Sequence, residues 1–192
     1  MKNYLIALKL FLVVTILTGL LYPVLITIIA QTAFRDQANG SLSYYKGNVV
    51  GSILIGQKFD KEKYFWPRPS AVDYNPLPSG GSNLSSTSKI LKDLVSERMN
   101  KLVSADRVKS GGIPSDLLFA SGSGLDPHIS PASAMLQVGR IAKARGIDKN
   151  NIIDLINGSI EKRDLLVFGE PRVNVLRLNE SLDNIGKAGM NK

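Results

Sequence analysis

The densest group of polar side chains lies between Ala120 and Ala132, in the sequence Ala-Ser-Gly-Ser-Gly-Leu-Asp-Pro-His-Ile-Ser-Pro-Ala. It contains His128, which is the only histidine of the chain, an aspartate two residues before it, and three serines. A serine hydrolase uses these three residue types as nucleophile, general base and orienting carboxylate. One interpretation of the segment is therefore a hydrolase in which Ser123, His128 and Asp126 carry the reaction.

The hydrolase pattern is incomplete in two respects. The Gly-x-Ser-x-Gly elbow lacks its first glycine, because Ser121 stands at that position. Asp126 and His128 are also separated only by Pro127, which leaves them little freedom to orient each other. The alternative, which we favour, is a structured turn that leads into a helix beginning with the N-cap Ser130.

Two Gly/Ser segments have the composition of loops that bind phosphate, since exposed backbone N–H groups ahead of a helix attract anions. Each of them precedes a predicted helix. The Walker signature also requires a lysine after its last glycine, and none follows Gly124. The candidate nucleotide or partner contacts in these segments are Ser79, Gly80, Gly81, Ser82 and Asn83, and Ser121, Gly122, Ser123 and Gly124, with Asp126 and His128 beside them.

Composition excludes several other kinds of site. The 192 residues include no cysteine and one histidine, so that thiol catalysis, thiolate ligands and the usual zinc clusters are excluded. Carboxylate pairs at a catalytic spacing are not evident. We therefore expect no metal site and no firmly bound cofactor.

The elements that position these groups begin with a membrane anchor. Residues 10–30 are apolar and uncharged, and the next charge is Arg35. A helix needs roughly 20 apolar residues to cross a bilayer. A cleaved signal peptide has a shorter apolar region and a small residue three positions before the cleavage site, where Gln31 stands in this chain. The sequence therefore predicts one uncleaved transmembrane helix.

Charge around the anchor predicts its orientation. Lys2 and Lys9 lie before the apolar run, whereas Arg35 and Asp36 offset each other after it. The positive-inside rule then places the N-terminus in the cytoplasm and the following domain outside, in the periplasm or the extracellular space. Beyond the anchor, 22 basic residues face 16 acidic ones, a balance that suits anionic lipid or an acidic protein surface better than nucleic acid.

Within the anchor, small and hydroxyl residues interrupt an otherwise uniform apolar surface. Small residues let a second helix approach closely, and hydroxyls can hydrogen-bond across the contact. The predicted packing positions are Thr15, Gly19, Tyr22 and Pro23. A plain anchor with a proline kink is the simpler alternative.

The rest of the chain predicts a single mixed α/β (α+β) domain anchored by this N-terminal helix. We divide the chain into a cytoplasmic N-terminus and anchor, a stalk, and an extracytoplasmic domain, at residues 1–34, 35–48 and 49–192. Helical periodicity and capping residues predict helices at 86–106, 130–146 and 148–158. Runs of β-branched and aliphatic residues predict strands within 49–59 and at 165–168 and 173–178.

A proline-rich segment, residues 64–82, contains the only tryptophan of the chain. Prolines fix φ and remove backbone donors, so that this segment is predicted to be an extended loop. Aromatic side chains in such a loop either pin it to a core or present a docking surface. The candidate docking residues are Trp66, Arg68 and Tyr74.

Taken together, these segments resemble the C subunit of the Kdp-type, high-affinity potassium-transporting ATPase. The resemblance runs in order along nearly the whole chain, through residues 51–59, 64–70, 74–75 with 79–84, 120–132 and 169–176. It implies a non-catalytic subunit with one transmembrane helix in the cell (inner) membrane. Its partners would be a channel-like subunit that binds potassium and a P-type ATPase subunit that hydrolyses ATP. The family's C subunit is needed for assembly and activity.

The same resemblance implies a second role, as a catalytic chaperone that raises the ATP affinity of the ATPase subunit. Ser79–Asn83 is similar to the Leu-Ser-Gly-Gly-Gln signature of transport ATPases, but Pro78 replaces the leucine and Ser82 the glutamine. A domain outside the membrane would meet no ATP, so this role conflicts with the predicted orientation. We favour the orientation, with ATP bound only through the complex. A cytoplasmic ATP-binding regulator and a membrane-tethered periplasmic hydrolase stay open as alternatives.

Overall fold

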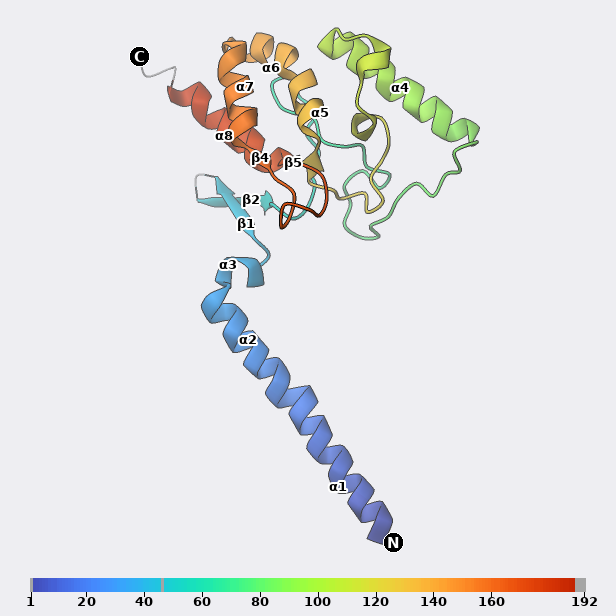
Figure 1. Cartoon of the computed structure of the whole chain (residues 1–192), viewed down its shortest axis with the longest axis vertical. Helices are drawn as coiled ribbons and strands as arrows, with labels where there is room; N and C mark the ends of the chain where they lie inside the picture. Colours follow the sequence, from blue (N-terminus) through green and yellow to red (C-terminus); the bar gives the residue numbers. More distant parts are fainter. Residues whose placement is uncertain (1, 46, 189–192) are drawn as a thin grey trace. The chain divides into compact units, whose positions relative to one another are not determined.

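The computed structural model describes residues 2–45 and 47–188, the last three of these by their backbone alone. The chain forms two compact units, which are divided between Ser52 and Ile53 (Figure 1). Each unit is described separately below.

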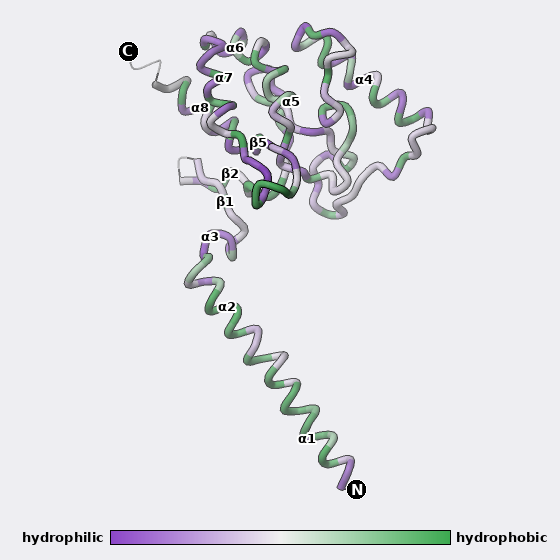
Figure 2. Tube along the Cα trace, viewed as in Figure 1, coloured by the Kyte–Doolittle hydropathy of each residue, from purple (hydrophilic) through white to green (hydrophobic). Residues whose placement is uncertain are grey.

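The first unit begins with one continuous apolar helix of 32 residues, Lys2–Ala33, whose most apolar 18-residue stretch has a mean hydropathy of 2.5. It consists of α1 (Lys2–Ile16), a π-helical turn η1 (Leu17–Leu21) and α2 (Tyr22–Ala33). Figure 2 shows the apolar character along its length, and none of its most apolar stretch is buried within the chain. The helix is therefore long and apolar enough to cross a membrane.

The π-helical turn has a local cause in the sequence. Pro23 has no N–H, so it cannot donate to the carbonyl four residues earlier, at Gly19. The helix widens over the preceding turn, where the N–H of Tyr22 donates to the Leu17 carbonyl, five residues back. The hydroxyl of Thr27 donates to the Pro23 carbonyl at 2.8 Å. The predicted proline irregularity is thus a wider helical turn.

A short helix and a β-hairpin complete the first unit. Helix α3 (Arg35–Ala38) follows the apolar helix, and strands β1 (Leu42–Tyr45) and β2 (Asn48–Ser52) pair antiparallel with a register shift between Ser43 and Tyr44. Strand β1 falls within the range predicted as a stalk. The strand predicted within residues 49–59 is shorter than expected, because β2 ends at Ser52 and the chain continues as a loop.

The second unit combines five α-helices with a small antiparallel sheet in the described residues (Figure 1). The sheet order is β3-β5-β4, so that β5 pairs with both neighbours. The helices are α4 (Lys89–Asp106), α5 (Pro131–Leu136), α6 (Val138–Arg145), α7 (Lys149–Gly158) and α8 (Val175–Ala188), with 3-10 turns η2 (Ser110–Gly112) and η3 (Ser115–Leu117). The strands are β3 (His128–Ile129), β4 (Ile160–Glu161) and β5 (Arg172–Asn174). The mixed α/β class predicted from the sequence is confirmed.

The three predicted helices are present, and polar caps set their starts. The Ser88 hydroxyl accepts the N–H of Leu91 at the start of α4, and the Asp148 carboxylate accepts that of Asn150 at the start of α7. The helix predicted at residues 130–146 is divided into α5 and α6 at Gln137, which is fully buried. Its amide bonds both the N–H and the carbonyl of Trp66, so the interruption serves a tertiary contact.

Two strand predictions were wrong. Residues 165–168 form the tip of a tight loop closed by a bridge between Asp164 and Phe168. The strand predicted at 173–178 ends at Asn174, and α8 begins at Val175. Val175, Leu178 and Leu182 are buried at helical spacing, and the Asn174 side chain accepts the N–H of Arg177 in the first turn. Burial on one helical face outweighed the β-propensity of the valines.

The core of the second unit is built mainly by α6, α7, α8 and the proline-rich loop. Its fully buried apolar side chains include Phe65, Ile141, Ile152, Ile156, Val173, Leu178 and Leu182. Helix α4 contributes one buried residue, Leu102, and is otherwise half-buried or exposed. The proline-rich loop and the 120–132 segment therefore lie on a rigid support, which fixes the positions of their polar groups.

Candidate functional site

The two Gly/Ser loops predicted from the sequence pack against each other. A Cβ added to Gly81 would lie 3.2 Å from the Gly122 carbonyl oxygen, and one added to Gly124 would lie 2.7 Å from the Gly80 carbonyl oxygen. Gly124 also has φ +71°, a backbone conformation that favours glycine. Close backbone contact therefore accounts for two of these glycines without any ligand.

A third segment closes over the same place. The N–H of Gly56 donates to the Leu125 carbonyl at 2.8 Å, and a Cβ on Gly56 would lie 2.6 Å from the Asp126 carbonyl oxygen. The Asn174 amide on β5 donates to the Ile53 carbonyl at 2.7 Å. Residues 53–56, 79–83 and 121–128, far apart in the sequence, are thus brought into one cluster.

Asp126 organises the turn that precedes β3. One carboxylate oxygen accepts the backbone N–H of His128 at 3.0 Å and lies 3.6 Å from its Nδ1, and the other accepts from Arg68 at 3.1 Å. Burial raises the pKa of this carboxyl, but the bonds from His128 and Arg68 outweigh burial and leave its pKa below the usual value. Asp126 is therefore held as a carboxylate between two donors.

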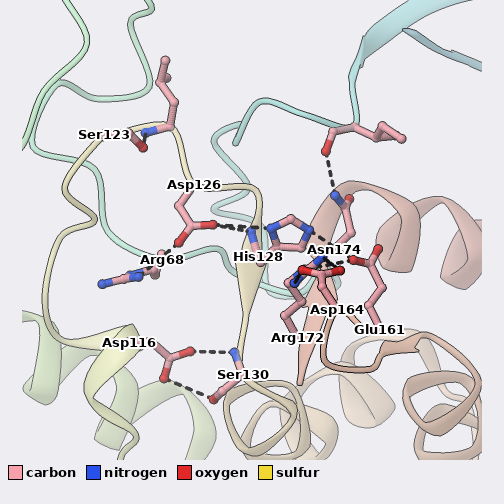
Figure 3. A network of polar contacts seen from close by, with 12 residues as sticks. Arg68, Asp116, Ser123, Asp126, His128, Ser130, Glu161, Asp164, Arg172 and Asn174 are labelled. Carbon is pink, nitrogen blue, oxygen red and sulfur yellow. Dashed lines mark hydrogen bonds and ion pairs between the residues drawn. The ribbon is translucent and has the colours of Figure 1, made fainter. Parts of the chain in front are cut away.

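The network continues from His128 into the sheet (Figure 3). Nε2 of His128 lies 3.6 Å from a carboxylate oxygen of Glu161, which accepts a 3.1 Å bond from Arg172. Arg172 also bonds Asp164, through two nitrogens at 3.1 and 3.3 Å. Acidic and basic side chains alternate along this chain of contacts, so most of its charge is neutralised internally.

The hydrolase interpretation finds little support in this geometry. The Ser123 hydroxyl accepts the N–H of Leu125 at 3.1 Å, and Figure 3 shows its side chain apart from His128. Within residues 2–45 and 47–188, no hydrogen bond joins Ser123 to His128. The expectation that Asp126 and His128 would not face each other was wrong, since the turn brings them within 3.6 Å despite Pro127. The pair lacks a nucleophile rather than an orienting group.

A neighbouring carboxylate that the sequence analysis did not single out fixes the start of α5. Asp116 accepts the N–H of Ser130 at 2.7 Å (Figure 3). It also accepts the hydroxyl of Ser133 at 2.7 Å. The predicted cap Ser130 accepts the N–H of Ser133. The segment after His128 is therefore the structured turn into a helix that the sequence analysis favoured.

The candidate docking residues are placed differently from one another. Trp66 is buried, with an exposed fraction of 8%, and its ring lies 4.0 Å from the Arg140 guanidinium carbon. Tyr74 donates its hydroxyl to the Arg68 carbonyl at 2.6 Å, and burial raises its pKa. Trp66 thus pins the loop to the core, which was one of the two alternatives. The Arg68 side chain, about 29% exposed, is more accessible than that of Trp66.

Sequence reasoning missed Arg140, although it lies within the helix predicted at residues 130–146. Its guanidinium forms a buried ion pair with Asp106 at 3.0 Å, donates to the Glu62 and Tyr64 carbonyls, and donates to Gln137 at 2.6 Å. Burial lowers the pKa of Arg140 and raises that of Asp106, while each partner opposes the shift of the other. In the sequence, an arginine between the apolar residues Val138 and Ile141 was the signal that could have indicated a buried, paired charge. Arg140 holds the proline-rich loop on α6.

The described residues offer few sites for a metal. No group of three or more histidine, cysteine, aspartate or glutamate side chains is arranged to hold an ion in this part of the chain. The chain combines an apolar helix long enough to cross a membrane with a compact mixed α/β unit. The polar cluster of that unit builds turns and neutralises its own charges.

Comparison with known proteins shows the family to which this chain belongs. The family model described as "K+-transporting ATPase, c chain" matches residues 4–184. Relatives named potassium-transporting ATPase KdpC subunit include those of Sorangium cellulosum, 51% identical over 180 residues, and Paraburkholderia phytofirmans, 48% identical over 178 residues. These alignments cover 92% and 91% of this chain and 95% and 93% of the relatives. The chain belongs to the KdpC family of potassium-transporting ATPase subunits, as its resemblance predicted.

Proposed function

We propose that the chain is a non-catalytic accessory subunit of an ATP-driven potassium uptake complex, in which it holds the channel-like and the P-type ATPase subunits in a working assembly. The observation that carries the proposal is the exposed apolar helix Lys2–Ala33, in a chain that belongs to this family. All of its large apolar side chains are accessible, from Tyr4 to Ile29. Lipid covers one part of such a surface, and helices of partner subunits cover the rest.

The helix has a place suited to close packing. A Cβ on Gly19 would meet nothing within 4 Å, so the backbone there is open to a neighbouring helix. Within about one turn of Gly19 lie Thr15 on one side and Tyr22 and Pro23 on the other. The π-helical turn Leu17–Leu21 lies between them, and such wider turns are frequent at functional sites. We assign the contact with a partner helix in the membrane to this region.

The folded domain acts, in this proposal, on the outer face of the channel-like subunit. The positive-inside rule supports this orientation. The cluster built by residues 53–56, 79–83 and 121–128 is rigid and turn-rich, with exposed Ser79, Ser82, Asn83, Gly122 and Ser123 at its surface. Such a surface suits partner contact through hydrogen bonds.

Direct contact with ATP is the second possible role of the domain, and it depends on the side of the membrane on which the domain lies. Gly81 and Gly124 are occupied by backbone contacts between the two loops. This favours a structural reason for those glycines over a phosphate cradle. Direct ATP contact through Ser79–Asn83 becomes the leading mechanism if the domain lies in the cytoplasm.

The experiment that tests the proposal compares complexes purified with and without this chain. The other subunits are co-expressed with the full-length chain or with an empty vector, and purified through a tag on the ATPase subunit. We expect the chain to co-purify, and the complex that lacks it to lose potassium-stimulated ATP hydrolysis. A complex that assembles and hydrolyses ATP equally well without the chain would overturn the proposal.

A further inference from the structure

Four consecutive large apolar side chains stand exposed at the tip of one loop of the second unit. Leu165, Leu166, Val167 and Phe168 have exposed fractions of 84, 80, 71 and 65%. Single exposed apolar residues are normal on a protein surface, whereas a contiguous group of this size marks an interaction site. We call residues 165–168 the apolar tip.

The loop that carries the apolar tip is a built structure. Asp164 and Phe168 exchange both backbone hydrogen bonds at 2.9 Å. The N–H groups of Leu166 and Val167 donate to the carbonyls of Arg163 and Asp164 at 3.1 and 3.2 Å. Most backbone donors of the tip are therefore satisfied within the loop, which lowers the cost of removing it from water.

The backbone of the tip is also strained. Leu165 and Leu166 have φ values of +52° and +67°, which branched L residues rarely adopt. Each such residue costs on the order of 1 kcal/mol or more and persists where the local shape has a use. The loop thus holds two leucines in a fixed direction, although their backbone conformation is unfavourable.

Charge at the base of the loop is largely neutralised. Arg163 pairs with Glu170 at 2.8 Å, and Arg172 pairs with Asp164 and Glu161 at 3.1 Å. Glu161 in turn lies 3.6 Å from His128, so the base of the loop is continuous with the Asp126–His128 turn (Figure 3). An apolar centre inside a neutral polar rim is the arrangement of a protein–protein contact.

We propose that the apolar tip is the anchor by which the domain docks into an apolar recess on a partner subunit of the same complex. The inference rests on the proposed function and names the contact residues within it. The recess has apolar walls and a polar, nearly neutral edge that matches the paired charges at the loop base. A few residues that are buried in a well-packed pocket dominate the energy of an interface, which is the position that the recess gives to the apolar tip.

The same features argue against a lipid surface as the occupant. Loops that bind anionic membranes use unpaired cations around their apolar residues. Here Arg163 and Arg172 are both committed to carboxylates, and Lys162 is the adjacent cation without an ion pair in the described residues. Insertion into a fluid bilayer does not require two leucines to point in a fixed direction, so the strained backbone of Leu165 and Leu166 would have no use at a lipid surface.

The first test replaces a tip residue by a charge. The variants Val167→Asp and Phe168→Asp of the full-length chain are co-expressed with the other subunits and purified through the ATPase subunit. We expect about tenfold or greater loss of the chain from the purified complex. The matched control is Ile90→Asp, an exposed apolar residue on α4 with an exposed fraction of 63%. Circular dichroism and thermal unfolding of each variant in detergent establish that the chain is folded.

The second test identifies the occupant. The chain has no cysteine, so Val167→Cys can be labelled alone with an environment-sensitive fluorophore. The labelled full-length chain is reconstituted in vesicles of phosphatidylethanolamine and phosphatidylglycerol, with or without the other subunits. We expect a blue shift of the emission only when those subunits are present, and none from label at Ser86→Cys.

The outcomes separate the inference from the proposed function. If the wild-type chain does not co-purify with the complex, the proposed function fails and the inference falls with it. If the wild type co-purifies and the two charge variants do so equally, the function stands and the docking role is overturned. A blue shift in vesicles of lipid alone would also overturn it, and would assign the apolar tip to the membrane.

Discussion

Asp126 accepts the backbone N–H of His128 at 3.0 Å while its carboxylate lies 3.6 Å from Nδ1 of the same histidine. The Asp-Pro-His sequence therefore forms a local turn in which one carboxylate fixes both the backbone and the ring of the residue that begins β3. Since the other carboxylate oxygen bonds Arg68 of the proline-rich loop, the turn joins two distant segments. This pair resembles part of a catalytic group in composition, but its contacts are those of a structural joint.

The turn makes a prediction about acid stability. The pKa of Asp126 is lower in the folded chain than its ordinary value of 3.8, so its contribution to stability is present above about pH 4 and is lost as the pH falls through the folded pKa. Asp126→Asn should lower the free energy of unfolding by about 1 kcal/mol at pH 7. The difference from wild type should shrink as the pH falls below about 4, in thermal unfolding followed by circular dichroism.

A suitable control for that measurement is Asp93→Asn. Asp93 is exposed on α4. Its substitution should leave the pH dependence of unfolding close to that of the wild type. A constant difference between Asp126→Asn and wild type from pH 7 to pH 3 would show that the carboxylate charge contributes nothing to the turn.

The contact between the two Gly/Ser loops predicts unequal effects of substitutions at Gly124 and Gly122, which are separated by one residue. Gly124→Ala would place a Cβ 2.6 Å from Val72 Cγ2 and 2.7 Å from the Gly80 carbonyl oxygen, at a φ of +71°. It should reduce the free energy of unfolding by about 2–4 kcal/mol. Gly122→Ala meets nothing within 4 Å and should change stability by less than about 1 kcal/mol.

These variants also bear on the nucleotide question. Denaturant unfolding of the purified full-length chain measures the stability difference. Equal stability of the two variants would mean that the loops are apart in solution, and the space between them would then be open to a ligand.

The buried ion pair predicts a large effect of a substitution outside the conspicuous motifs. Replacing Arg140 by methionine leaves Asp106 buried without its partner and removes the bonds to the proline-rich loop. The expected loss is about 3–5 kcal/mol of the free energy of unfolding. The double variant Arg140→Met with Asp106→Leu should recover part of it, because no unpaired charge remains. Failure of the double variant to recover any stability would assign the loss to the other contacts of Arg140, which are those with the Trp66 ring, Gln137 and the Glu62 and Tyr64 carbonyls.

How far the sequence predicts this fold depends on the range of the interactions involved. The helices at 89–106 and 149–158 follow from local caps and apolar spacing, so sequence patterns were sufficient. The start of α8 depended on which face of residues 175–182 meets the core, and a run containing two valines predicted a strand instead. The apolar run at 165–168 was also predicted as a strand, because a short continuous apolar run is typical of a buried strand and the sequence does not show that these side chains stay exposed.

The candidate site shows the same division. The Gly/Ser loops and the Asp126–His128 turn were identified because their residue types are conspicuous in the sequence. Glu161, Arg172 and Asp116 come from other segments and meet the turn only in the fold, so that no spacing rule could indicate them. Arg140 was hidden because a charged residue within an apolar stripe is ordinarily treated as an interruption rather than as the centre of a network.

Orientation in the membrane can be tested directly in intact cells. Ser86 is exposed in the segment before α4, and the chain has no other cysteine to label. The flanking lysines predict that Ser86→Cys reacts with a membrane-impermeant maleimide without lysis. Labelling only after lysis would place the domain in the cytoplasm and favour ATP contact through Ser79–Asn83. Asn3→Cys, on the other side of the apolar helix, leaves both lysines in place and should give the opposite pattern in the same experiment.

The packing proposed for the membrane helix predicts the effect of added volume at one position. Gly19 lies within the π-helical turn, and its Cα is open to a neighbouring helix. A leucine there would hold a partner backbone away, because small residues are what permits close helix contact in a bilayer. Gly19→Leu should therefore release the chain from the complex during detergent purification, as measured by its ratio to the ATPase subunit. Val13→Leu adds volume to the same helix outside that turn and should leave the ratio unchanged. Retention of Gly19→Leu at the wild-type ratio would mean that the helix acts as a plain anchor and that the folded domain carries the assembly contacts.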